Sequence, residues 1–172
     1  MSGNRIMLVE DETIIAMDLT QRLEKYGYTV VATAVSGAQA MERIVSARPD
    51  LIIMDIMIKG PIDGIETAIQ IQKQYRVPII FLSANSEEST VARARTAGAY
   101  GYLVKPFRPE ELHASIEVAL VKATMESQLR QSEQWFAKTL RCISDAVVAT
   151  DDQGKGRFLN PVAEKLTGRP QK

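Results

Sequence analysis

Short apolar runs alternate with amphipathic stretches along the first 120 or so residues of the chain. The runs are rich in Val, Ile and Leu and are mostly bounded by Gly, Pro, Asp or Ser, which is typical of β-strands. The stretches between them repeat apolar residues every three or four positions, which is typical of helices packed on one side. The pattern predicts strands at residues 5–9, 28–34, 50–54, 78–82 and 101–104.

Five strands alternating with helices predict an α/β fold built on a doubly wound, five-stranded parallel sheet. Right-handed crossovers in such a fold place helices over both faces of the sheet. The runs 51–54 and 79–82 are apolar at every position, as expected for central strands buried on both faces.

From Pro109 onward the pattern predicts one long helix over residues 109–140. Pro109 suits a first helical turn, and Glu110 and Glu111 place acids near its positive end. No Gly or Pro interrupts residues 122–140. Apolar residues early in this helix are expected to face the sheet, namely Leu112, Ile116, Ala119, Leu120 and Ala123.

The second half of this helix carries a weak heptad pattern. Met125, Leu129, Ser132 and Phe136 follow a spacing of four, three and four residues. The apolar stripe changes phase between Ala123 and Met125. The pattern favours a homodimer formed through the helix, and Trp135 and Phe136 would then pack at a helix interface. A solvated helix or linker is the alternative.

The last part of the chain predicts two short strands joined by a turn, followed by a short helix. These elements are expected at residues 146–150, 157–159 and 162–168. About 30 residues with two strands are too few for an independent core, so we expect a piece of a longer protein. The expected regions are a domain at 4–122, a helical linker at 123–140 and the start of a second domain at 141–172.

Composition narrows the class of protein. The 21 basic and 21 acidic residues give a formal net charge of zero, which lacks the basic footprint of a nucleic-acid binder. The single cysteine, Cys142, excludes an intrachain disulfide. No apolar run approaches the roughly 18 residues of a membrane span, and the N-terminus is unlike a signal peptide. We expect a cytoplasmic location, with no membrane contact and no direct contact with nucleic acid in this segment.

Polar side chains follow four of the five predicted strands. Glu10 and Asp11 follow the first, Asp55 the third, Ser83 the fourth and Lys105 the fifth. Because parallel strands end at the same edge of a sheet, these groups are expected to form one site.

Carboxylates gathered at one edge repel one another and call for a cation. Carboxylate and carbonyl oxygens suit Mg²⁺, whereas the only histidine, His113, lies on a predicted helix elsewhere, which argues against zinc. A carboxylate beside Mg²⁺ can act as a nucleophile towards a phosphoryl group. The Lys105 ammonium could offset phosphoryl charge, Ser83 could donate to a phosphoryl oxygen, and Ala84 leaves room for access.

In order and spacing these motifs resemble the receiver domain of two-component response regulators. The matching segments are residues 6–12, 54–57, 63–66, 82–84, 98–99 and 102–107. The resemblance covers about residues 4–122 and implies a flavodoxin-like (βα)5 fold. It also implies a regulatory phosphoacceptor rather than an enzyme that acts on substrates.

The resemblance assigns a role to each candidate residue. Asp55 would accept a phosphoryl group from a phosphohistidine of a sensor histidine kinase or phosphotransfer protein. Glu10 (through water), Asp11, Asp55 and the main-chain carbonyl of Met57 would bind Mg²⁺. Ser83, Ala84 and Lys105 would contact the phosphoryl group, Ser83 and Tyr102 would form the conformational switch, and the Lys105–Pro106 bond would be cis.

Two features depart from the family pattern. Many receivers have two aspartates where this chain has Glu10 and Asp11. Many also have a Met-Pro pair soon after the phosphorylated aspartate. Here the connection of residues 56–62 before Asp63 and Gly64 is one residue longer than usual. We expect a different loop geometry over the site.

The segment from Ser132 onward resembles the opening part of a PAS domain. The matching residues are Phe136, 143–147, 150–151, Gly154, 158–160 and 163–168. The resemblance implies that the receiver regulates a PAS-linked output. An unrelated hairpin and helix is the alternative.

Two other functions fit the same residues less well. A Mg²⁺-dependent aspartyl-phosphate phosphatase or phosphotransferase resembling haloacid dehalogenases would need a second acid where the chain has Met57. A nucleotide- or flavin-binding domain would need a Gly-rich loop where the chain has Glu10 and Asp11. Taken singly, Asp11 or Ser83 could be a helix cap, and His113 a surface residue.

Overall fold

The computed structural model describes residues 3–84, 87–154 and 156–168. The chain folds into two units, Met1–Thr124 and Met125–Lys172. None of the helices in the described residues combines the length and the apolar character that crossing a membrane requires.

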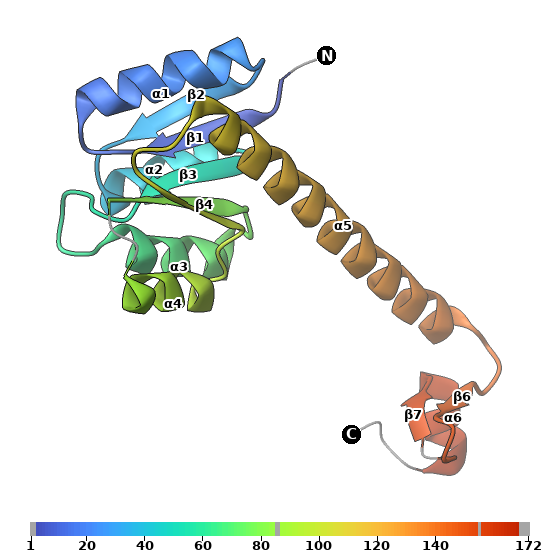
Figure 1. The fold of residues 1–172 in the computed structure, drawn as a ribbon. Coiled ribbons are helices and arrows are strands. Elements are labelled where there is room, and N and C mark those ends of the chain that lie inside the picture. The colour runs from blue at the N-terminus through green and yellow to red at the C-terminus, as the bar shows by residue number, and fades with distance from the viewer. Residues whose placement is uncertain (1–2, 85–86, 155, 169–172) are drawn as a thin grey trace. The chain divides into compact units, whose positions relative to one another are not determined.

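The first unit is built on a five-stranded parallel sheet in the order β2-β1-β3-β4-β5 (Figure 1). Its strands are β1 Arg5–Val9, β2 Thr29–Ala34, β3 Leu51–Asp55, β4 Ile79–Ser83 and β5 Gly101–Val104. Its helices are α1 Thr13–Lys25, α2 Gly37–Ala47, α3 Gly64–Gln74, α4 Glu88–Thr96 and the first part of α5 Pro109–Cys142. The predicted fold class is confirmed, and the predicted strand limits hold to within about one residue.

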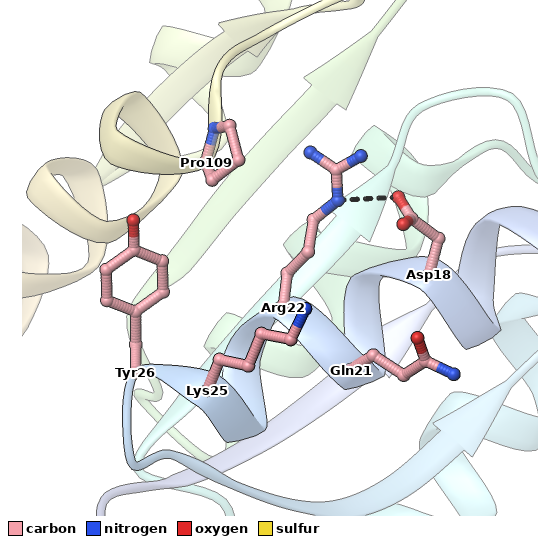
Figure 2. A pocket seen from close by; sticks show the side chains of 6 residues that line it. All are labelled: Asp18, Gln21, Arg22, Lys25, Tyr26 and Pro109. Atoms are coloured by element: carbon pink, nitrogen blue, oxygen red, sulfur yellow. Dashed lines mark ion pairs between the residues drawn. The ribbon is translucent and has the colours of Figure 1, made fainter.

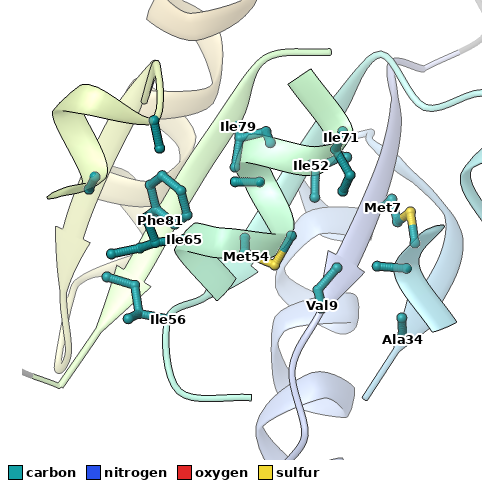
Figure 3. Close-up of a cluster of buried hydrophobic side chains, with 14 of the residues drawn as sticks. Met7, Val9, Ala34, Ile52, Met54, Ile56, Ile65, Ile71, Ile79 and Phe81 are labelled. Atoms are coloured by element: carbon teal, nitrogen blue, oxygen red, sulfur yellow. The ribbon is translucent and has the colours of Figure 1, made fainter. Parts of the chain in front are cut away.

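Successive strand residues point to opposite faces of this sheet and fill two separate cores. On one face, side chains from the central strands pack against α2, α3 and α4 (Figure 3). On the other face they pack against α1 and the first part of α5. Phe81 belongs to the first core, and its neighbours Ile80 and Leu82 belong to the second. Both faces of β4 are therefore covered, which explains its apolar sequence.

Helix α5 changes environment along its length. Leu112, Ile116 and Ala119 are buried against the sheet, as the sequence predicted. Farther along the helix, large apolar side chains are exposed. The helix therefore has a covered first part and an uncovered second part.

The second unit contains an antiparallel pair of short strands, β6 Val148–Thr150 and β7 Gly156–Leu159, followed by α6 Pro161–Thr167. Asn160 precedes α6 and is fully buried. Its Oδ1 accepts from the backbone N–H groups of Val147 at 2.9 Å and Ala163 at 3.0 Å. Its Nδ2 donates to the carbonyl oxygens of Ile143 at 3.2 Å and Asp145 at 2.8 Å. One side chain thus joins the segment after α5 to the start of α6.

Replacing Asn160 with alanine should loosen the second unit and leave the first unit unchanged. The change leaves the buried N–H of Ala163 and the half-buried N–H of Val147 without an acceptor, at a cost of about 1–3 kcal/mol for a fully buried group. Amide hydrogen exchange at Val147 and Ala163 should therefore accelerate by about tenfold or more. Lys165→Ala, at an exposed position of α6, is the matched control. Unchanged exchange at both amides would contradict the role given to Asn160.

Candidate functional site

The ends of neighbouring strands bring three of the expected side chains together. β1 pairs with β3, and β3 pairs with β4 with Asp55 opposite Leu82. β4 in turn pairs with β5, with Ser83 opposite Val104. Glu10 directly follows β1 and Lys105 directly follows β5, so both lie at the same edge of the sheet as Asp55.

Lys105 bridges two buried carboxylates at this edge. Its Nζ lies 2.7 Å from Glu10 Oε2 and 2.5 Å from Asp55 Oδ2. Glu10 is 2% exposed and Asp55 is 6% exposed, whereas the Lys105 side chain is 21% exposed. The ammonium group therefore reaches in from the more open side and neutralises part of the charge of both acids.

Burial shapes the protonation of this cluster. It raises the pKa of Glu10, and the nearby charge of Asp55 acts in the same direction, against the opposing bond from Lys105. Burial alone would lower the pKa of Lys105, but its bonds to Asp55 and Glu10 outweigh that effect and raise the pKa. The lysine is thus held as a cation, while Glu10 remains incompletely compensated.

The second oxygen of each carboxylate is bound by the backbone. Asp55 Oδ1 accepts from the N–H of Met57 at 2.9 Å, and Glu10 Oε1 accepts from the N–H of Glu12 at 3.2 Å. Asp11 is not the cap of α1, because Glu12 occupies the N-cap position. Within the described residues, Asp11 does not join Glu10 and Asp55 in a three-acid metal cluster.

The remaining expected residues lie close by along the strands. Ser83 ends β4 and is buried, and Ala84 next to it is exposed. Tyr102 is half-buried and packs against the core on the α4 side of the sheet. The peptide bond between Lys105 and Pro106 is cis.

Comparison with known proteins identifies the family of the first unit. A family model described as the response regulator receiver domain matches residues 6–117. The chain belongs to this family. Receiver domains are regulatory phosphoacceptors of two-component systems.

Similar proteins include a curated regulator and two solved receiver domains. The transcriptional regulatory protein PdtaR of Mycobacterium tuberculosis is 42% identical over 116 residues, which are 67% of this chain and 56% of that protein. The signal receiver domain of a modulated diguanylate cyclase from Desulfovibrio desulfuricans is 35% identical with a TM-score of 0.68, covering 72% of this chain and 98% of that one.

The second solved structure is the N-terminal domain of a response regulator/sensory box/GGDEF 3-domain protein from Carboxydothermus hydrogenoformans. It is 36% identical with a TM-score of 0.66, and the match covers 72% of this chain and 98% of that one. Against the curated relatives the coverage is smaller, since the chain spans just over half of their length.

The receiver domain family is typically Mg²⁺-dependent, and the chemistry of this edge fits that ion. Glu10 and Asp55 offer buried, hard oxygen donors of the kind that Mg²⁺ prefers. One ammonium group, that of Lys105, faces two carboxylates here, and burial raises the pKa of Glu10. A further cation would therefore be stabilised by these carboxylates.

The longer connection after β3 is anchored at both of its ends. Gly64 donates its N–H to the carbonyl of Ile56 at 2.9 Å, and a Cβ built on Gly64 would lie 2.0 Å from the carbonyl oxygen of Asp55. Only glycine allows this approach behind Asp55. Midway, Lys59 forms an isolated parallel bridge with Ser36, the N-cap of α2. The connection thus lies against the start of α2.

The start of α3 is also tied to α4. Asp63 Oδ1 accepts from the N–H of Glu66 at 2.8 Å and caps α3. Its Oδ2 pairs with Arg93 of α4 at 2.6 Å. The Asp63 side chain therefore joins the end of the long connection to the helix that follows β4.

The structure corrects the interpretation of His113 as a plain surface residue. His113 is half-buried, stacks on Tyr26 with ring centroids 4.4 Å apart, and has its Nδ1 2.8 Å from the Tyr28 hydroxyl. That hydroxyl donates to Glu117 at 2.7 Å, and burial together with this bond raises the pKa of Tyr28. No local sequence signal pointed to this cluster, because Tyr28 and His113 lie 85 residues apart.

A surface pocket of about 410 Å³ lies next to this cluster and apart from the acidic edge. It is lined by Asp18, Gln21, Arg22, Lys25, Tyr26 and Pro109 (Figure 2). Arg22 pairs with Asp18 at 2.7 Å on its rim. None of Glu10, Asp55, Ser83 and Lys105 lines it.

Glu10→Gln should stabilise the receiver domain at neutral pH. A carboxyl group whose pKa is raised on folding disfavours the charged folded form relative to the unfolded chain. The gain should be present above the folded-state pKa and should vanish below the ordinary value of 4.5, where the carboxyl is protonated in both states. Urea midpoints on both sides of that range measure the effect.

Glu12→Gln, at an exposed position beside the site, is the matched control and should leave the midpoint unchanged. A lower midpoint for Glu10→Gln at neutral pH would mean that the bonds from Lys105 outweigh the cost of burying the carboxylate.

Proposed function

We propose that Asp55 is the phosphoacceptor of this receiver domain. The observation that carries the proposal is the ion pair between Asp55, at the end of β3, and Lys105, after β5. A nearly buried carboxylate held by a lysine is placed to react in a site from which most water is excluded. Lys105 can then neutralise negative charge on the Asp55 carboxylate before the reaction and on the phosphoryl oxygens during it.

In the proposed reaction, an Asp55 carboxylate oxygen attacks the phosphorus of a phosphohistidine on a histidine kinase or phosphotransfer protein. A P–O bond forms as the P–N bond breaks, and the imidazole leaves with its electron pair and takes up a proton. Glu10, Asp11, Asp55 and the Met57 carbonyl are the groups we propose for holding Mg²⁺. When bound, this ion offsets negative charge on the phosphoryl group.

The proposed response lies at the ends of β4 and β5. Ser83 is buried beside Asp55's strand and can donate its hydroxyl to a phosphoryl oxygen. Its movement would let Tyr102 change its packing against the core on the α4 side. The ion pair between Arg93 and Asp63 fixes α4 in the form described here, so it is one contact that such a change would have to rearrange.

Asp55→Asn should abolish phosphoryl uptake from acetyl phosphate in the presence of Mg²⁺. An amide oxygen is a poor nucleophile and cannot form the acyl phosphate. Intact-mass spectrometry under non-acidic, rapid conditions should detect one added phosphoryl group on the unmodified chain and none on the variant. Asp152→Asn, at an exposed position of the second unit, is the control and should label normally. Normal labelling of Asp55→Asn would remove Asp55 as the acceptor.

We also propose that residues 141–172 are the opening part of a PAS domain, that residues 123–140 are the helical linker before it, and that the receiver regulates it. The antiparallel strands β6 and β7, and the capped helix α6 that follows them, support this proposal. The Carboxydothermus relative, in which a receiver precedes a sensory box, is a precedent for the order. Copies of the chain would pair through α5.

In the described residues β6 and β7 pair only with each other, and a two-stranded sheet is marginally stable. We therefore expect amides of β6 and β7 to exchange much faster than those of β1 and β3 in the same sample. Equal protection in the two sheets would contradict this expectation.

A further inference from the structure

The second part of α5 has an apolar stripe that the chain leaves uncovered. Met125 is 63% exposed, Leu129 62% and Phe136 60%. Residues 125–142 amount to about five helical turns, and helices in proteins gain most of their stability from the packing of an apolar face. Contacts that stabilise this part of α5 are therefore expected along the stripe.

The spacing of the stripe follows an eleven-residue repeat rather than a heptad. Steps of three, four and four residues lead through Val118, Val121, Met125, Leu129, Ser132, Phe136, Leu140 and Ile143. Every member except Ser132 is apolar. A heptad through the same start would place Lys122 and Thr139 in the stripe instead of Val121 and Leu140. The eleven-residue repeat therefore accounts for the phase change that a heptad leaves unexplained.

This period has a geometric consequence. Eleven residues over three turns correspond to about 3.67 residues per turn, slightly more than the 3.6 of a straight α-helix. Two such helices stay in contact with a slight right-handed supercoil, in contrast to the left-handed coil of heptad sequences.

We propose that residues 125–143 pair in parallel and in register with the same residues of a second copy of this chain. The α5 stripe, defined as Met125, Leu129, Ser132, Phe136 and Leu140 on the helix and Ile143 directly after it, forms the seam. The inference deepens the pairing through α5 put forward above, and it is independent of the chemistry of Asp55.

The composition of the stripe favours the parallel arrangement. In a parallel pair each apolar residue meets its counterpart, and Ser132 meets Ser132, where one hydroxyl can donate to the other. In an antiparallel pair centred on the stripe, Ser132 would face Phe136 twice and leave two hydroxyls against aromatic rings. Gln128, Glu133 and Thr139 flank the stripe, so the flanks bring no row of like charges together.

The oligomeric state of the full chain tests the pairing. Light scattering coupled to size exclusion should give a dimer at micromolar concentrations, because a seam of this length buries apolar side chains from both copies. Leu129→Lys buries a charge in the seam and should give a monomer. Gln134→Lys lies on the opposite side of the helix and should remain dimeric. A monomeric unmodified chain, or a dimeric Leu129→Lys, would overturn the proposal.

Labelling by acetyl phosphate separates this proposal from the proposed function. All three proteins should take up phosphoryl groups equally, since Asp55 lies in the first unit. A failure of labelling with dimerisation intact would count against Asp55 alone, and the reverse result would count against the seam alone.

Cysteine cross-linking tests the register and the repeat, and it does not depend on a destabilising variant. In a Cys142→Ser background, Ser132→Cys and Leu140→Cys should form disulfides between copies, because paired seam positions bring Cα atoms within about 7 Å. Thr139→Cys and Gln134→Cys should react at least tenfold more slowly. Faster cross-linking at 139 than at 140 would establish a heptad instead. Absence of cross-linking at both 132 and 140 would overturn the parallel, in-register pairing.

Discussion

The placement of one cation between two buried acids is the interaction on which the site depends. Glu10 and Asp55 come from strands that are neighbours in the sheet, and without Lys105 their charges would face each other in a region with little water. The sheet makes this possible because both faces are packed and only its edge is free for polar groups. Burying the two acids costs stability at this edge, and the two apolar cores compensate for it.

The sequence predicted the sheet well because each strand carries its own signal. Continuous apolar runs such as Leu51–Asp55 and Ile79–Ser83 are readable without any knowledge of their neighbours. The approach of Glu10, Asp55 and Lys105 followed from the rule that parallel strands end at one edge. The register of the pairs then fixed which groups became adjacent.

The sequence could not predict contacts that depend on side-chain geometry. Strand position places Asp11 next to Glu10 but does not say which of them turns towards Lys105. The stack of His113 on Tyr26 depends on the packing of α5 beside the end of α1, and neither segment has a sequence feature that predicts this contact. Asn160 matched a family motif in the sequence, yet its bonds to Val147 and Ala163 became apparent only from the folded backbone.

Asn160 also limits where the chain can be truncated without loosening α5. Its amide group holds backbone groups of Ile143 and Asp145, just beyond the last turn of α5, although it lies far after them in the sequence. A shorter chain that stops between the helix and Asn160 would keep every residue of α5 and still lose what holds its end. The end of α5 is therefore held by a residue outside the helix, and fragments intended to isolate α5 would fray at its C-terminal end.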